Sequence, residues 1–304
     1  MSSSRPARRG LVQISLAGVL WGTGGLVVQL VRERVPMSVL TISAWRMALA
    51  ALVLLLALVV LRRLPELTRL LRARPGTAVA VGLLTGAYQA LYFAAVVTAG
   101  VTVATVVALG LAPVLLTVAE AVLARRAPGR TQLLVLLAAL GGLVLVSTAA
   151  GLAVTGPRPG LGVLLAVASG VTYAAATALG RPLSAVSSPL ALATVTSCAG
   201  AFGLLPLGLL ARGPHLTGDP VAVALLGYLG VVTLALAYAL LYAGLRTVTG
   251  SAAVVATLLE PLTAAVLAAL VLGERLGVLG VVGGVLILLA VAGSATPRAE
   301  PLRP

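Results

Sequence analysis

Apolar residues along this chain gather into ten blocks of membrane-spanning length, separated by short segments rich in arginine, glycine and proline. A bilayer core about 30 Å thick needs roughly 20 helical residues at 1.5 Å per residue. The blocks therefore predict ten transmembrane helices, over residues 11–31, 38–61, 76–98, 101–123, 131–150, 160–180, 188–210, 220–244, 250–273 and 276–293. Most connections are short, which favours antiparallel neighbours.

The longest connection between two apolar blocks, residues 62–75, reads LRRLPELTRLLRAR. A helix with this sequence would carry its leucines on one side and its arginines on the other. We predict a basic segment that lies on the membrane surface, with leucines toward the lipid and arginines toward water.

A pair of tyrosines four residues apart occurs once in each half of the chain. Tyr88 and Tyr92 lie in one apolar block, and Tyr238 and Tyr242 lie in another, 150 residues later. Each pair precedes a short polar and glycine-containing break, and then a block with a proline near its middle. A unit of membrane-length helices that occurs twice is a common signature of small-molecule transporters.

This duplication divides the chain into two repeats of five spans with a tail at either end. Because five is an odd number, the second repeat enters the membrane from the opposite face, and the repeats are inverted. The predicted fold is an all-α membrane protein with ten transmembrane helices in two inverted five-helix repeats. The predicted divisions are the tail 1–10, the repeats 11–150 and 160–294, and the tail 295–304.

Composition supports the membrane assignment and excludes several kinds of chemistry. Hydrophobic residues make up 60% of the chain and charged residues only 9%, whereas soluble domains carry roughly a quarter charged residues. All 21 basic residues are arginines, which excludes a retinal Schiff base, a Ser-Lys dyad and a phosphate-loop lysine. The single cysteine, Cys198, and the single histidine, His215, lack partners at metal-ligand spacing, so we expect neither a metal nor another cofactor.

The arginines also predict how the chain is oriented. Fifteen of them lie in the two tails and the connections on the same side, and five lie in the connections on the other side. Because excess arginine stays in the cytoplasm, both termini are expected there. The net charge of +14 therefore reflects membrane topology, and no nucleic-acid partner is expected.

Three stretches resemble a known family. They are GVLWGTGGLVV (18–28), SGVTYAAATALGRPL (169–183) and LLEPLTAAVLAALVLGERL (258–276). These are similar to the two repeat openings and the Glu-Pro helix of the EamA-type ten-helix transporters in the drug/metabolite transporter superfamily. The first copy of the Glu-Pro helix departs from the family pattern, with Ala112 in place of the glutamate and Arg126 in place of Glu274.

The resemblance implies a carrier in the bacterial cytoplasmic membrane, often an exporter of amino acids or other small metabolites. We expect a secondary transporter that moves a small polar or amphipathic metabolite by alternating access, with an amino-acid-like substrate and export as the first hypothesis. Its expected partners are the substrate, the lipid bilayer and, where transport is ion-coupled, protons, and a monomer is favoured. A passive channel is the alternative. An intramembrane enzyme is disfavoured because neither H-E-x-x-H nor G-x-S-x-G occurs.

Glu260 is the most informative single residue, because an ionisable group near the middle of a span is costly to insert. It either binds a cationic group of the substrate or a proton, or it orders the helix interrupted by Pro261 through local hydrogen bonds. Both interpretations remain open from the sequence. Pro113 and Pro261 are predicted kinks and candidate hinges beside a cavity.

Aromatic residues supply the candidate cavity wall. The candidates are Trp21, Tyr88, Tyr92, Tyr173, Tyr238 and Tyr242. Tyr92 and Tyr242 are also explained by the preference of tyrosine for the membrane interface, and Tyr88 and Tyr238 are the deeper members of their pairs. In the sharper interpretation the two tyrosine pairs are gates, one on each side of the binding site.

Two further charged residues have simple expectations. Arg46 is expected to extend its guanidinium to the outer interface, with contact to a substrate carboxylate as the minority alternative. Glu120 is expected to form a surface ion pair with the arginines that follow it. The glycines beside Trp21, among them Gly22 and Gly25, are expected to permit close helix packing.

Overall fold

A computed structural model describes residues 4–149, 157–271 and 277–294, and every regular element within them is a helix. The elements are α1 (Ser4–Arg34), α2 (Val39–Val60), α3 (Leu64–Ala73), α4 (Pro75–Ala99), α5 (Val101–Ala124), α6 (Arg130–Ala149), α7 (Pro159–Val186), α8 (Pro189–Leu210), α9 (Pro220–Gly230), the π-helix η1 (Val231–Leu236), α10 (Ala237–Leu245), α11 (Gly250–Thr257), α12 (Leu259–Val271) and α13 (Val278–Ser294).

Ten spans result from these elements, which confirms the predicted fold class. Nine helical stretches in the described residues are long and apolar enough to cross a membrane, and the shorter apolar helix α13 is the tenth. The eighth span runs continuously from α9 through η1 to α10, and the ninth consists of α11 and α12. α1 begins at Ser4, so most of the predicted N-terminal tail is helical, while the predicted tail 295–304 lies outside the described residues.

Local sequence signals set the helix starts in corresponding places of the two repeats. Ser38 precedes α2, and its hydroxyl accepts a hydrogen bond from the Thr41 amide at 3.0 Å. Ser188 precedes α8 and accepts from the Ala191 amide at 3.1 Å. Each hydroxyl satisfies a backbone amide that has no partner within the first helical turn. The matching caps place the second spans of the two repeats in the same register.

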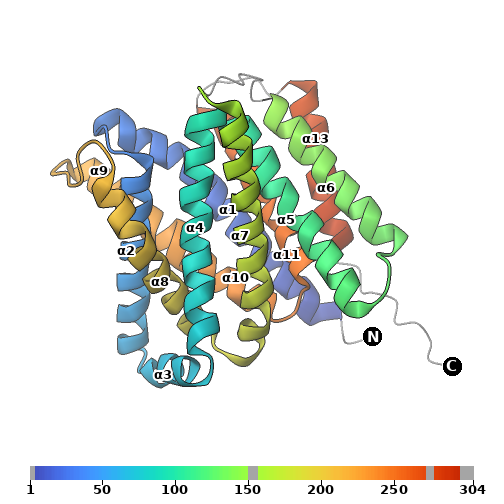
Figure 1. Cartoon of the computed structure of the whole chain (residues 1–304), viewed down its shortest axis with the longest axis horizontal. Helices are drawn as coiled ribbons and strands as arrows, with labels where there is room; N and C mark the ends of the chain where they lie inside the picture. The colour runs from blue at the N-terminus through green and yellow to red at the C-terminus, as the bar shows by residue number, and fades with distance from the viewer. Residues whose placement is uncertain (1–3, 150–156, 272–276, 295–304) are drawn as a thin grey trace.

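The spans run side by side, and the short helix α3 lies across the lower end of the bundle (Figure 1). This end, where α1 also begins, is called the terminal face below, and the other end is called the opposite face. The α3 helix has the predicted amphipathic sequence, and its Leu70 is buried while most of its arginines are exposed. The neighbouring Arg63 forms an ion pair with Glu66 at 2.7 Å.

The two repeats interleave, because each long helix of the first repeat packs on a helix of the second. The pairs are α4 with α7, α2 with α8, α6 with α13, and α1 with both α10 and α12. Glycines mark equivalent contacts: a Cβ on Gly18 would lie 3.2 Å from the Ala256 carbonyl oxygen, and one on Gly170 would lie 2.8 Å from that of Ala108. Such backbone approaches are typical of membrane helices, where packing rather than hydrophobicity holds helices together.

Candidate functional site

A cavity of about 510 Å³ lies between the repeats, a size typical of small-molecule sites. Helices from both repeats line it, including α1, α2, α4, α5, α7, α10 and α12. At the opposite face its lining includes residues in the first or last helical turns, such as Val39, Thr102 and Ala149. In the other direction the lining includes Leu245, the buried last residue of α10, so the cavity runs from the opposite face past the middle of the bundle.

The structure brings nearly all the sequence-predicted site residues to this cavity. The lining includes Trp21, Tyr88, Tyr92, Tyr173, Tyr238, Tyr242, Glu260 and Pro261. Pro113 does not line it and is buried within α5. Residues from distant parts of the chain thus share one chamber, and their roles in binding remain predictions.

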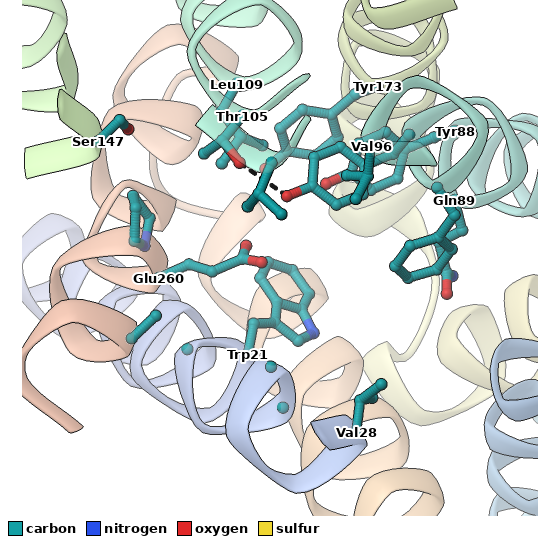
Figure 2. Close-up of a pocket in the computed structure, with 18 of the residues that line it drawn as sticks. Trp21, Val28, Tyr88, Gln89, Val96, Thr105, Leu109, Ser147, Tyr173 and Glu260 are labelled. Carbon is teal, nitrogen blue, oxygen red and sulfur yellow. Dashed lines mark hydrogen bonds between the residues drawn. The ribbon is translucent and has the colours of Figure 1, made fainter. Parts of the chain in front are cut away.

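Aromatic rings form part of the cavity wall as two pairs, and each pair joins one residue of the first repeat to one residue of the second. Tyr88 of α4 stacks on Tyr173 of α7, with ring centroids 4.9 Å apart and an interplanar angle of 25°. Trp21 of α1 meets Tyr238 of α10 edge to face at 5.5 Å. Figure 2 shows Tyr88 and Tyr173 across the cavity from Trp21. Offset and edge-to-face arrangements are the favourable geometries of aromatic pairs.

The hydroxyls of the five tyrosines that line the cavity fall into two groups. Three pair with threonines at 2.8 Å, namely Tyr92 with Thr105, Tyr173 with Thr257, and Tyr242 with Thr196. Tyr88 and Tyr238, the deeper members of the two sequence pairs, have no hydrogen-bond partner for their hydroxyls among the described residues. These two hydroxyls are therefore available to a ligand in the cavity.

Tyr92 and Tyr242, the outer members of the two sequence pairs, both face the interior of the bundle. Tyr242 is only 3% exposed, and both side chains line the cavity. Their hydrogen bonds to threonines on neighbouring helices explain how hydroxyl groups are accommodated inside the bundle.

Glu260 extends its carboxylate from α12 into the cavity toward Trp21 (Figure 2). No described residue forms a hydrogen bond with this carboxylate, so the interpretation that it orders the backbone beside Pro261 has no support. The backbone is nevertheless interrupted there, because α11 ends at Thr257 and α12 begins at Leu259. α5, by contrast, continues unbroken through Pro113, so only the second proline accompanies a break.

Arg46 does not extend to the interface, contrary to the expectation from its sequence. Its side chain lines the cavity and is 9% exposed. One guanidinium nitrogen donates to the Thr233 hydroxyl at 3.2 Å, while Nε has no partner. Thr233 belongs to the π-helix η1 and donates its own proton to the Leu229 carbonyl oxygen at 2.6 Å. The side chain stays inside the bundle because Thr233, which is distant in the sequence, accepts its hydrogen bond and because the cavity gives it space there.

Among the polar residues of the lining that were not identified from the sequence, two have buried uncharged side-chain groups without a hydrogen-bond partner. Gln89 is 7% exposed, and both atoms of its amide lack partners. Ser147 is 8% exposed and its hydroxyl likewise has no partner. Figure 2 places them on different sides of the chamber. The position of Gln89 beside Tyr88 was the one available signal, since buried polar groups are normally paired and an unpaired one suggests a ligand.

At the terminal face the two repeats are joined by polar contacts. The Glu120 carboxylate of α5 accepts from the Ser251 amide at 3.0 Å and from the Ser251 hydroxyl at 2.6 Å, at the start of α11. Glu120 therefore caps a helix of the other repeat, a role that the sequence did not predict. Nearby, within the second repeat, Arg181 of α7 donates from Nε to the Val248 carbonyl oxygen at 2.9 Å.

At the opposite face, the position equivalent to Glu120 carries no carboxylate. Glu120 lies seven residues after Pro113, and the residue seven after Pro261 is Ala268. Ala268 lines the cavity, as does Thr102 in the first turn of α5. The repeats are therefore in polar contact at the terminal face, whereas the corresponding residues at the opposite face line the cavity.

The fold and the cavity together define a class of protein, the helical membrane transporters built from two inverted five-helix repeats. The chain belongs to the EamA-like transporter family, whose model matches residues 8–148 and again residues 160–296. The double match confirms the duplication, and membership confirms the predicted family. The family and its members are described as transporters, as the sequence predicted in preference to an enzyme.

Individual proteins support this assignment. Over 290 residues the chain is 31% identical to the "Uncharacterized transporter YwfM" of Bacillus subtilis (strain 168), and the match covers 94% of each protein. A solved structure described as "Crystal structure of protein" has a TM-score of 0.78 and 18% identity, covering 93% of this chain and 95% of that one. The latter likeness supports the fold alone.

Proposed function

We propose that this protein is a secondary carrier that moves a small polar or amphipathic metabolite by alternating access. The observation that supports the proposal is the cavity itself, which reaches the opposite face, whereas at the terminal face Glu120 of one repeat is hydrogen-bonded to Ser251 of the other. Following the family resemblance, we propose export as the direction of transport. The direction of net flux is set by the gradients of the substrate and of any coupled proton.

Inverted repeats supply the two states that such a carrier needs. Exchanging the conformations of the two repeats would bring Ala268 toward Thr102 and would separate Glu120 from Ser251. The cavity would then open at the terminal face and close at the opposite face. A passive channel is less well supported, because a permanently open pore would leave no closed face.

Counterflow in proteoliposomes tests the carrier. Vesicles preloaded with an unlabelled solute are expected to accumulate the same labelled solute transiently and saturably, because a carrier returns through its loaded form. A panel of the twenty standard amino acids is the first set of solutes. Uptake that rises linearly with concentration and shows no overshoot would establish a channel instead.

We propose a bacterial plasma membrane location with the terminal face in the cytoplasm, on the basis of the arginine asymmetry. Two exposed glycines with open space around them give matched probes, Gly129 between α5 and α6 and Gly218 before α9. In a Cys198→Ser background, Gly218→Cys should react with an impermeant thiol reagent in intact cells, whereas Gly129→Cys should react only after lysis. The opposite labelling pattern would reverse the orientation.

A further inference from the structure

Two opposite charges lie in the same cavity and do not neutralise each other directly. Arg46 approaches from α2 and Glu260 from α12, and both line the chamber. Within the described residues they form no ion pair with each other or with any other charged group. The nearest sequence analogues in the other repeat are uncharged: the shared cap register aligns Arg46 with Thr196, and the proline register aligns Glu260 with Ala112.

Leaving these groups unsatisfied is energetically unfavourable. A charge in an apolar interior is tolerated when it is paired and hydrogen-bonded. Arg46 has one hydrogen bond through its guanidinium and an unpartnered Nε, and the Glu260 carboxylate has none from the described residues. Their remaining hydrogen-bonding capacity is therefore directed at whatever occupies the cavity.

The sign of both charges restricts the occupant. An anion would satisfy Arg46 but would place a second negative charge in the chamber with Glu260. A cation would satisfy Glu260 but would be repelled by Arg46. A ligand with both charges satisfies both residues and leaves the net charge of the site unchanged.

We propose that Arg46 and Glu260 bind the two ends of one zwitterionic substrate of the amino-acid class. This inference rests on the proposed carrier function and adds the two residues that bind the charged ends of the solute and the orientation in which they hold it. The carboxylate of the substrate lies at Arg46, where the planar guanidinium can donate two hydrogen bonds, and the ammonium lies at Glu260.

The rest of the chamber fits an apolar side chain on that substrate. Helix α1 contributes glycines on the side that faces these charges, and a Cβ on Gly24 would lie 3.8 Å from the Arg46 guanidinium. Trp21, Tyr88 and Tyr238 supply aromatic surface, and the unpaired amide of Gln89 supplies a further hydrogen bond. Apolar walls with a few placed polar groups are the usual composition of a small-molecule site.

The test measures the thermal stability of the purified protein with each of the twenty standard amino acids. A ligand that binds only the folded protein raises Tm by an amount that grows with the ratio of its free concentration to its Kd. The amino acid with the largest effect is then compared with its amide, which lacks the carboxylate, and with its N-acetyl derivative, which lacks the ammonium. We expect both derivatives to bind wild-type protein about 10- to 100-fold more weakly, as for the loss of a charged hydrogen bond.

The decisive result is a crossed pattern in two variants. Arg46→Gln should lose the preference for the acid over the amide, and Glu260→Gln should lose the preference for the free amine over the N-acetyl form. Arg32→Gln and Glu33→Gln change the same residue types at exposed positions and should behave as wild type. If Arg46→Gln does not fold, Arg46→Lys keeps the cation and should keep the preference for the acid.

Unchanged discrimination in both cavity variants, or equal binding of acid and amide to wild type, would overturn the assignment. So would the absence of stabilisation by any of the twenty amino acids while counterflow detects another solute, a result that would leave the carrier function standing. Conversely, a crossed binding pattern without counterflow of any solute would support the zwitterion site and contradict the carrier function.

Discussion

Replacing Gly25 with leucine is expected to reduce transport to near background while the protein remains folded and inserted. Gly25 lines the cavity, and a Cβ built on it meets no atom within 4 Å. A leucine here enters space that the substrate must occupy. Because the added carbons displace no protein atom and cover apolar surface, Tm should equal or exceed that of the wild type.

Counterflow and Tm, measured on the same preparations, check this prediction. Gly25→Ala should have an intermediate effect, because its single methyl group fills less of the chamber. The close helix packing predicted for Gly25 from its sequence is wrong, since its neighbours leave open space. Normal counterflow in Gly25→Leu would remove this part of α1 from the substrate route.

Gly22→Leu, unlike Gly25→Leu, is expected to destabilise the fold, so that little folded protein is obtained. A Cβ on Gly22 would lie 2.5 Å from the carbonyl oxygen of Glu260 and 2.5 Å from Cβ of Thr263. Backbone atoms cannot move aside as a flexible side chain can, so α1 would be forced away from α12. Overpacking of this kind costs about 1–3 kcal/mol, and a backbone clash falls at the upper end or beyond.

The yield of monodisperse protein in mild detergent, together with Tm, measures this effect. Gly22→Ala already introduces the clashing Cβ and should lower Tm, whereas Gly25→Ala, three residues along the same helix, should not. This pair separates packing from obstruction within one helix. A Gly22→Leu protein as stable as wild type would show that α1 and α12 do not approach as closely as described.

Much of the fold was predictable because the bilayer constrains it so strongly. A helix that crosses the membrane needs an apolar stretch of a particular length, and that length is directly visible in the sequence. The surface segment containing α3 was equally visible, since its arginines and leucines segregate along a helix. The duplication was visible because Tyr88 and Tyr238 each begin a tyrosine pair at the same place in the two repeats. Both residues line the cavity in the structure.

Which side of each span faces inward could not be predicted in the same way. The membrane helices are apolar all round, so periodicity gives little information about their buried side. Arg46 finds its acceptor in Thr233, 187 residues away, within a π-helix that no sequence pattern indicated. Glu120 likewise caps a helix whose first turn lies 131 residues along the chain. Neither contact can be read from the sequence, where water at the interface is the nearest partner for Arg46 and the following arginines are the nearest partners for Glu120.

The central claim is that one cavity opens alternately to the two faces, and the terminal face is where it can be tested most directly. In a Cys198→Ser background, Glu120→Cys and Ser251→Cys can be joined by a reducible bifunctional thiol reagent, which holds α5 and α11 together at that face. The joined protein should still be stabilised by its ligand, but its counterflow should fall to background and recover on reduction. Each single-cysteine variant treated with the same reagent should transport as before treatment. Counterflow that continues unchanged through the joined protein would contradict alternating access.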